Sequence, residues 1–257
     1  GDRNTTYFHA CIKESRRSPL PNIRLEDGSY FDDINVVGGM VESYFKKLLS
    51  GPNPNLADGY QRGQGEVTGV VPAMVSRLDN DLIEALPQEN EILGAVRSLN
   101  LESAPGPDGF PGSFFRASWG IFKTDMVAAI QDFFRGGFLP RAASATTMVL
   151  IPKLNNPTLL QHYLPVSMCN FSYKILASIL NNRISKHLTH WISLEQHGFV
   201  KQRSIQGAIA VCQEVTDDIN TKVHGSNMVI KLDMDKDYDR LEWSFILNVL
   251  TGMGLSP

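Results

Sequence analysis

The chain has 257 residues, of which 42% are hydrophobic and 20% charged, and its formal net charge at pH 7 is −3. This is the composition of an ordinary globular protein, with enough length to bury a sizeable core in one large or two modest domains. No run of about 18 apolar residues occurs, so neither a membrane-spanning helix nor a membrane partner is expected. The three cysteines, Cys11, Cys169 and Cys212, are odd in number, widely spaced and without a Cys-x-x-Cys pair, so neither a zinc site nor a disulfide framework has support.

The charge is unevenly distributed along the chain. Residues 141–212 contain seven Lys and Arg residues and a single acid, Glu195, whereas the rest of the chain is acidic. A basic segment of this kind predicts contact with a phosphate backbone. Solvated helix faces are the alternative interpretation, and the charge pattern alone leaves both open.

The N-terminal part predicts a short strand at residues 23–25, followed by a tight turn at Asp27-Gly28. Asp33 is placed to begin a helix, because an apolar stripe follows it. The stripe consists of Val37, Val41, Tyr44, Phe45 and Leu48. Residues 50–70 are rich in Gly, Pro and Asn, which predicts a linker or long loop.

The middle of the chain predicts helices over residues 88–99 and 114–134, separated by an irregular loop at 103–112 with three prolines and three glycines. Residues 146–151 are β-prone and end in Pro152-Lys153. Further helices are expected over 173–188 and 206–220, and alternation predicts a strand over 228–234. Because strands and helices mix irregularly, the fold class is predicted to be α+β.

Asp233 stands at the end of this last predicted strand, where its carboxylate can face a metal ion. Hard oxygen ligands of this type suit Mg²⁺, which completes its coordination with water and substrate phosphates. The alternative is that the charged run after Leu232 is only a solvated turn and helix start.

Residues 231–243 read Lys-Leu-Asp-Met-Asp-Lys-Asp-Tyr-Asp-Arg-Leu-Glu-Trp. This stretch resembles motif A of reverse transcriptases, in the form found in plant LINE (non-LTR) retrotransposons, with Asp237 in place of the usual alanine. Other segments resemble the same family in the same order. They are residues 1–9, 104–110, 150–153, 165–183 and 196–200.

The resemblance implies the fingers and a partial palm of a right-hand polymerase, preceded by a mainly helical extension. Residues 1–88 would be the extension and linker between endonuclease and polymerase regions, and residues 89–257 the fingers and the start of the palm. The implied function is RNA-directed DNA polymerisation. RNA template, DNA primer, deoxynucleoside triphosphates and Mg²⁺ are the implied partners, in the nucleus or cytoplasm.

The resemblance also implies individual roles. Asp233 would bind both catalytic metal ions, and the backbone carbonyl of Met234 would contact one of them. Tyr238 would exclude a 2′-hydroxyl, with a core aromatic as the alternative. Lys153 would contact the incoming nucleotide or the template. Lys201 and Arg203 would contact the template backbone, with ordinary surface charges as the alternative.

Several positions depart from the family pattern. Leu164 replaces an arginine that would bind phosphate, Ser103 replaces a lysine, and Gln202 replaces a glycine. The second carboxylate box, Tyr-x-Asp-Asp, does not follow motif A, so we expect a truncated and inactive polymerase fragment. The alternatives are a non-catalytic nucleic-acid-binding remnant and an unstable pseudogene product. Residues 30–33 read Tyr-Phe-Asp-Asp, but they precede the fingers and lead into a helix, so a catalytic role is not expected.

Overall fold

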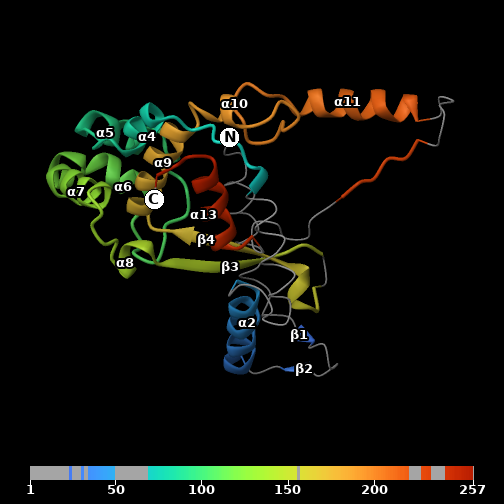
Figure 1. The fold of residues 1–257 in the computed structure, drawn as a ribbon. Coiled ribbons are helices and arrows are strands. Elements are labelled where there is room, and N and C mark those ends of the chain that lie inside the picture. The colour runs from blue at the N-terminus through green and yellow to red at the C-terminus, as the bar shows by residue number, and fades with distance from the viewer. Residues whose placement is uncertain are drawn as a thin grey trace. The chain divides into compact units, whose positions relative to one another are not determined.

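The computed structural model describes residues 23–24, 30–31, 34–49, 69–154, 157–219, 227–232 and 241–256 (Figure 1). The chain divides into two compact units. The first unit combines residues 1–47 with 84–180, and the second combines residues 48–83 with 181–257. The mixture of helices with small antiparallel sheets agrees with the predicted α+β class.

The N-terminal elements of the first unit follow the predicted order. Strands β1 (Ile23–Arg24) and β2 (Tyr30–Phe31) pair antiparallel, and α2 (Ile34–Leu49) comes next. Val37 of α2 is 4% exposed and packs with Leu160 of the 3-10 helix η2 (Leu160–His162), and Val41 and Tyr44 lie against this pair. The predicted stripe is therefore the buried face of α2. The proposed helix start at Asp33 and most of the predicted linker lie outside the described residues.

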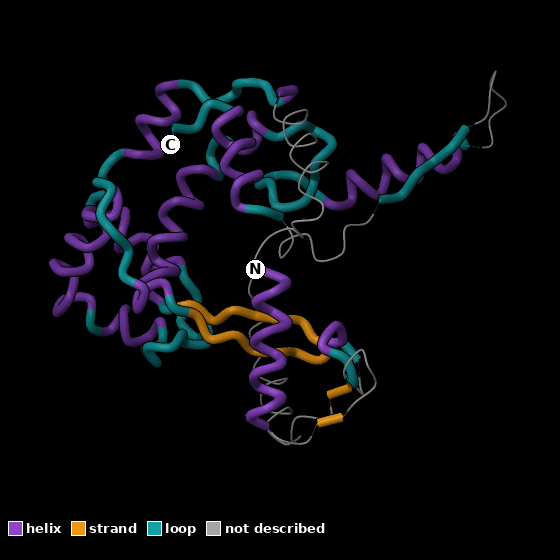
Figure 2. Tube along the Cα trace, turned by 60° about the horizontal axis from the view of Figure 1, so that its bottom comes forward, coloured by secondary structure: helices purple, strands orange, loops and turns teal. Residues whose placement is uncertain are grey.

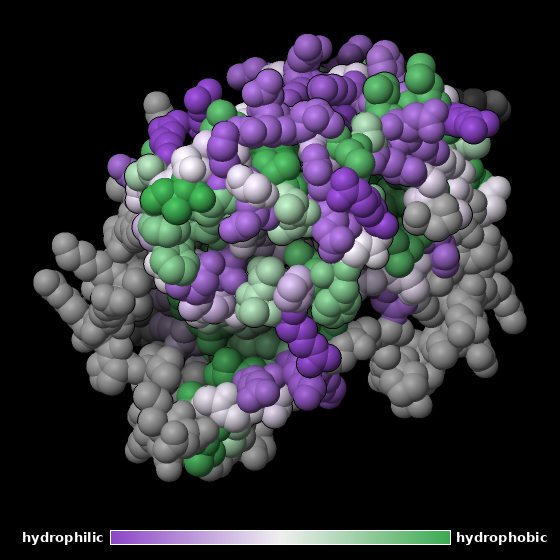
Figure 3. All heavy atoms as spheres, turned by 90° about the vertical axis from the view of Figure 1, so that its left-hand side faces the viewer, coloured by the Kyte–Doolittle hydropathy of each residue, from purple (hydrophilic) through white to green (hydrophobic). Residues whose placement is uncertain are grey.

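The main core of the first unit is built by four helices. They are α5 (Glu89–Ser98), α6 (Gly112–Ala117), α7 (Trp119–Phe134) and α9 (Phe171–Ile184). Ile92, Val96 and Ile175 are fully buried in it. Figure 3 views the side on which α5, α6 and α7 lie and shows apolar side chains reaching the surface among polar ones.

The prediction of a single helix over residues 114–134 is wrong, because the helix is interrupted at Ser118 (φ −96°, ψ 8°), between α6 and α7. The break lets rings from both helices meet in one core. Phe115 of α6 stacks on Phe171 at 4.9 Å between ring centroids, and Phe122 of α7 packs edge-on against Phe115 at 5.4 Å. Apolar spacing does not reveal such a break, because both segments keep helical periodicity.

A longer hairpin pairs β3 (Thr146–Pro152) with β4 (Tyr163–Cys169), after the short helix α8 (Arg141–Ser144). The register runs from Thr146 opposite Cys169 to Pro152 opposite Tyr163. Figure 2 shows the two strands side by side along their length. The β-prone run at residues 146–151 is confirmed as a strand, whereas its partner β4 was not predicted.

The second unit contains most of α4 (Arg77–Glu84), followed by α10 (Leu188–Trp191), α11 (Ile205–Asp218) and α13 (Trp243–Gly252). The N–H groups of Met74 and Val75 both donate to the carbonyl of Met253 at 2.9 Å. Asn80 adds hydrogen bonds to the carbonyl of Gly254 (2.8 Å) and from the N–H of Ser256 (3.2 Å). The segment around α4 is thereby attached to the end of α13.

Two predicted elements of the C-terminal half differ from the structure. The helix expected to reach Leu188 ends at Ile184, before α10 begins. Residues 227–232 form no strand, and Met228, Ile230 and Leu232 are exposed. An alternating segment becomes a strand only when a neighbouring strand accepts its hydrogen bonds. In the part of the chain that the structure describes, no helix is long and apolar enough to cross a membrane.

Candidate nucleic-acid interface

Lys153 lies directly after β3, at the end of the β3–β4 hairpin. Its backbone N–H donates to the carbonyl of His162 at 2.8 Å, so the pairing continues one residue beyond Pro152. The Lys153 side chain is exposed and can therefore meet an anion without desolvating a buried charge. On the opposite strand, Leu164 is 43% exposed. The hairpin thus presents one cation, together with an apolar side chain at the position where the family carries arginine.

Asn170, between β4 and α9, connects three segments of the first unit. Its side chain is almost completely buried, with 2% of the residue exposed. The amide group donates to the carbonyl of Ala142 at 2.8 Å, and the oxygen accepts from the backbone N–H of Asp108 at 3.1 Å. Every polar atom of a buried amide needs such a partner. Asn170 therefore attaches both α8 and the loop at residues 105–109 to the end of the hairpin.

The loop at residues 105–109, Pro-Gly-Pro-Asp-Gly, approaches Asn170 more closely than a side chain at Gly106 would permit. A Cβ at Gly106 would lie 2.4 Å from the backbone nitrogen of Asn170 and 2.4 Å from its side-chain oxygen. The turn closes with a hydrogen bond from Gly109 N–H to the Gly106 carbonyl (3.0 Å), and Gly109 takes φ +74°. The glycines of this motif are thus explained by backbone contact and by a left-handed turn.

Lys174 of α9 holds the start of the same loop. Its ammonium group donates to the carbonyl of Ala104 at 3.0 Å and to the hydroxyl of Ser103 at 3.3 Å. The lysine that the family carries at position 103 would bring a second cation beside this one. Ser103 instead accepts a hydrogen bond, so the replacement is compatible with the local contacts.

Residues 193–204, which we call the 193–204 loop, connect α10 to α11 in the second unit. The guanidinium of Arg203 donates to four backbone carbonyls that surround it. They are the carbonyls of Thr189, Ile192, Ser193 and Gln196. The carbonyls at the end of a helix lack partners within that helix, and arginine can satisfy several at once with its planar fork. Arg203 therefore holds the loop onto the end of α10.

Two residues of the 193–204 loop take left-handed backbone conformations, Phe199 with φ +62° and Gln202 with φ +67°. Residues with a Cβ seldom adopt this region. Lys201, between them, is exposed. The pKa of Glu195 lies below its ordinary value. The main cause is a hydrogen bond from the backbone N–H of Glu195 itself, followed by one from the hydroxyl of Ser193, and the charge of Arg203 contributes less. The glycine that the family carries at position 202 suits this backbone, which gives that family feature a physical explanation.

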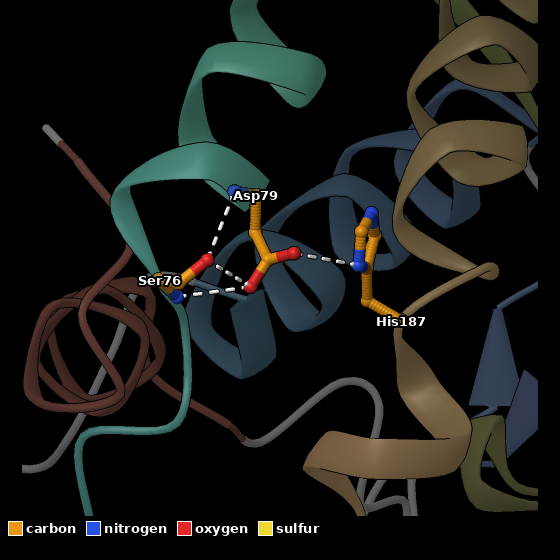
Figure 4. Close-up of polar contacts among 3 residues, drawn as sticks. All are labelled: Ser76, Asp79 and His187. Atoms are coloured by element: carbon orange, nitrogen blue, oxygen red, sulfur yellow. Dashed lines mark hydrogen bonds and ion pairs between the residues drawn. The ribbon is translucent and has the colours of Figure 1, made fainter.

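A polar group of three residues in the second unit joins α4 to the segment after α9 (Figure 4). The hydroxyl of Ser76 donates to Asp79 at 2.8 Å, and the N–H of Asp79 donates back to that hydroxyl at 3.2 Å. The other carboxylate oxygen of Asp79 lies 3.0 Å from Nδ1 of His187, whose ring stacks on Trp191. This is a capping box extended by a histidine. The pattern Ser-x-x-Asp at residues 76–79 is the sequence signal that would have predicted the capping box.

Residues 151–257 match the reverse transcriptase (RNA-dependent DNA polymerase) family. The whole chain is 24% identical to the "Transposon TX1 uncharacterized 149 kDa protein" of Xenopus laevis, and 165 residues are 25% identical to the "Retrovirus-related Pol polyprotein from type-1 retrotransposable element R1" of Bradysia coprophila. Residues 151–257 are thus similar to reverse transcriptases, and both relatives are named as transposon or retrotransposon proteins.

The similarity covers only part of each relative. The match to the TX1 protein covers 100% of this chain and 19% of the TX1 protein. The match to the R1 polyprotein covers 62% of this chain and 16% of the R1 polyprotein. Both relatives come from animals, and neither supports the plant origin that motif A suggested.

The site residues predicted from the sequence fall into three groups. Asp233, Met234 and Tyr238 lie outside the described residues. Lys153 belongs to the first unit, and Lys201 and Arg203 lie together in the 193–204 loop of the second. Within the described ranges, no group of three or more His, Cys, Asp or Glu side chains could hold a metal ion. The sequence prediction missed Asn170, although this residue lies within the segment 165–183 that resembles the family.

Proposed function

We propose that this chain supplies the fingers and the beginning of the palm of an RNA-directed DNA polymerase encoded by a LINE-type retrotransposon. The match of residues 151–257 to the reverse transcriptase family is the observation that carries the proposal. This segment includes Lys153, Lys201, Arg203 and Asp233. The form of motif A at residues 231–243 is the basis for proposing the plant branch of these elements.

The proposed work of the domain is to hold a template, a primer and a nucleotide. Lys153, exposed at the end of the hairpin, would meet the triphosphate or the template as a point charge. Lys201 would contact template phosphates without reading their sequence. Tyr238, five residues after Asp233, would exclude a 2′-hydroxyl by its bulk. Residues 1–88 remain proposed as the extension and linker, and residues 89–257 as the polymerase part.

Asp233 and the backbone carbonyl of Met234 are the proposed ligands for the divalent metal, for which we propose Mg²⁺. Oxygen donors of this chemistry fit a hard cation that retains water and phosphate ligands. When bound, the metal would stabilise charge on the attacking and leaving oxygens of nucleotidyl transfer. Asp233 would orient this ion. Lys231, two residues before Asp233, is exposed.

Binding of an RNA template annealed to a DNA primer tests the proposal with the chain as it stands. We expect salt-dependent binding, and we expect Mg²⁺ to strengthen retention of the complementary deoxynucleoside triphosphate on this complex. Asp233→Asn should abolish the Mg²⁺ effect and leave the salt-dependent binding. A chain that binds no nucleic acid at low salt would overturn the proposal.

Primer extension on the same substrate provides a catalytic measurement. RNA-templated synthesis that disappears in Asp233→Asn would establish polymerisation and refute the inactivity expected from the sequence. Binding without any Asp233-dependent Mg²⁺ effect favours the alternative of a non-catalytic nucleic-acid-binding remnant. Thermal unfolding without a cooperative transition favours the unstable pseudogene product.

A further inference from the structure

Phe199 combines an exposed aromatic side chain with a backbone conformation that is unfavourable for a bulky residue. Its side chain is 89% exposed, and its backbone has φ +62°. A bulky residue in the left-handed region costs on the order of 1–3 kcal/mol and persists only where its surroundings impose it. An exposed aromatic ring also remains in water instead of a core. Such strain at an exposed side chain indicates a binding role.

The 193–204 loop is built so that the ring of Phe199 points outward. The next residue, Val200, is 7% exposed and anchors the loop inward. The guanidinium of Arg203 donates to the carbonyls of Ser193 and Gln196 in the first half of the loop. Because these two anchors hold the loop around Phe199, the side chain is presented on a preorganised turn.

The His197 ring completes the support of this turn. Its Nδ1 lies 2.9 Å from the carbonyl of Glu195, and a Cβ at Gly207 of α11 would lie 2.9 Å from its Nε2. The ring thus rests against the first turn of α11, next to Gly207. The preceding residue, Ser204, caps the same helix by accepting from the N–H of Gln206 at 3.2 Å.

Lys201 is exposed two residues from Phe199. An aromatic face beside a cation is the arrangement by which proteins hold single-stranded nucleic acid, with the base stacked on the ring and the phosphate near the charge. The part of the basic segment that belongs to the same unit, residues 181–212, carries four Lys and Arg residues and one acid, Glu195, which is the charge that a phosphate backbone requires. Leu194, within the loop, and Ile205, directly after it, are 79% and 70% exposed but have no planar face on which a base could stack.

We propose that Phe199 is the stacking platform for an unpaired base of a single-stranded RNA template, with the adjacent phosphate at Lys201. The inference deepens the proposed polymerase function and rests on it. It also gives Arg203 a different role from the one expected from the sequence. Because the Arg203 guanidinium is engaged with backbone carbonyls, Arg203 acts as a positioning residue for the turn that carries Phe199 and Lys201.

The test is binding of a 12-nucleotide single-stranded RNA that contains fluorescent 2-aminopurine, whose emission falls when it stacks. The full chain is compared with Phe199→Leu, which keeps an apolar side chain but removes the planar ring, and with Phe199→Tyr, which keeps the ring. We expect Phe199→Leu to weaken binding on the order of tenfold and to abolish quenching. Phe199→Tyr should retain both.

Two further variants separate stacking from charge and from folding. Lys201→Gln should lower the slope of log affinity against log salt by about 0.7 and leave the quenching in the bound complex. Phe199→Gly relieves the left-handed backbone, so it should fold at least as stably as the unmodified chain while binding as weakly as Phe199→Leu. This variant keeps the test valid if Phe199→Leu unfolds.

The possible outcomes distinguish failure of the Phe199 stacking proposal from failure of the proposed polymerase function. Salt-dependent RNA binding that is equal in the unmodified chain and in Phe199→Leu overturns the stacking platform and leaves the polymerase proposal intact. No RNA binding by the unmodified chain overturns both. If Phe199→Leu abolishes self-association in sedimentation and leaves RNA binding unchanged, Phe199 is a contact between copies of the chain, and the inference is wrong.

Discussion

The side-chain oxygen of Asn170 accepts a hydrogen bond from the backbone N–H of Asp108, 62 residues earlier in the chain, at 3.1 Å. Because the Asn170 amide also donates to Ala142, one buried side chain determines where both the 105–109 loop and α8 lie. The loop therefore depends on a residue at the far end of the first unit's sequence.

Replacing Asn170 should destabilise the first unit. Asn170→Ala leaves the carbonyl of Ala142 and the N–H of Asp108 without these partners, and we expect a loss of about 1–3 kcal/mol in the free energy of unfolding. Urea unfolding measures this loss. Asn248→Ala, at an exposed position of α13, is the control and should change stability by less than about 0.5 kcal/mol. Equal effects of the two substitutions would contradict the role of Asn170.

Two glycine-to-alanine substitutions should change the stability of the protein in opposite directions. Gly106→Ala places a methyl group 2.4 Å from Asn170 and should destabilise the protein. Gly94→Ala, in the interior of α5 with nothing within 4 Å of the added Cβ, should stabilise it by roughly 0.5–1 kcal/mol. Thermal unfolding of both variants checks the signs. A neutral Gly106→Ala would show that the 105–109 loop does not pack on Asn170 as described.

Gln202→Gly should stabilise the 193–204 loop. A residue with a Cβ at φ +67° costs about 1–2 kcal/mol, and this cost exceeds the roughly 0.4–1 kcal/mol by which glycine stabilises the unfolded chain. The expected result is slower hydrogen exchange of the loop amides and an unchanged or higher melting temperature. Lys201→Gly, without a left-handed backbone, should instead lower the melting temperature. The same direction for both would refute the conformational explanation.

Asp79 should make the second unit sensitive to acid. The hydrogen bond from the backbone N–H of Ser76, with smaller contributions from the Ser76 hydroxyl and His187, holds the pKa of Asp79 below its ordinary value of 3.8. A depressed pKa contributes stability above the ordinary value, and this contribution disappears as the pH falls through the lower folded pKa. The difference in unfolding free energy between the unmodified chain and Asp79→Asn should therefore shrink below about pH 4.

Urea unfolding from pH 2 to pH 6 measures the contribution of Asp79. Ser76→Ala is the companion variant, because it removes the hydroxyl and keeps the backbone N–H that bonds to Asp79. Part of the pH dependence should survive in it. A stability difference between the unmodified chain and Asp79→Asn that stays constant over this range would exclude Asp79 as its source.

Leu164→Arg should restore nucleotide binding, because the guanidinium can form a bidentate contact with phosphate that leucine cannot. Position 164 is 43% exposed on β4, so the longer side chain has room. We expect tighter binding of a deoxynucleoside triphosphate on the order of tenfold. Leu164→Lys adds a charge without the planar fork and should gain less. Equal gains in the two variants would show that net charge alone is responsible.

Local patterns in the chain were enough for α2, α5 and α11, because apolar residues at helical spacing specify which face a helix buries. The family motifs predicted roles for Lys153 and Lys201, and both residues are exposed in the structure. For Asp233, Met234 and Tyr238 the motif remains the basis, since they lie outside the described residues. Periodicity failed at Ser118 and for β4, where the outcome depends on which distant side chains meet.

The same distinction separates the two basic residues of the 193–204 loop. Their identity and spacing in the sequence were equally compatible with binding phosphate. In the folded chain Lys201 is exposed, whereas the Arg203 guanidinium donates to backbone carbonyls as far back as Thr189. Composition specifies the charge that a side chain carries. Whether that charge is available to a ligand depends on the backbone atoms that tertiary folding brings within hydrogen-bonding distance.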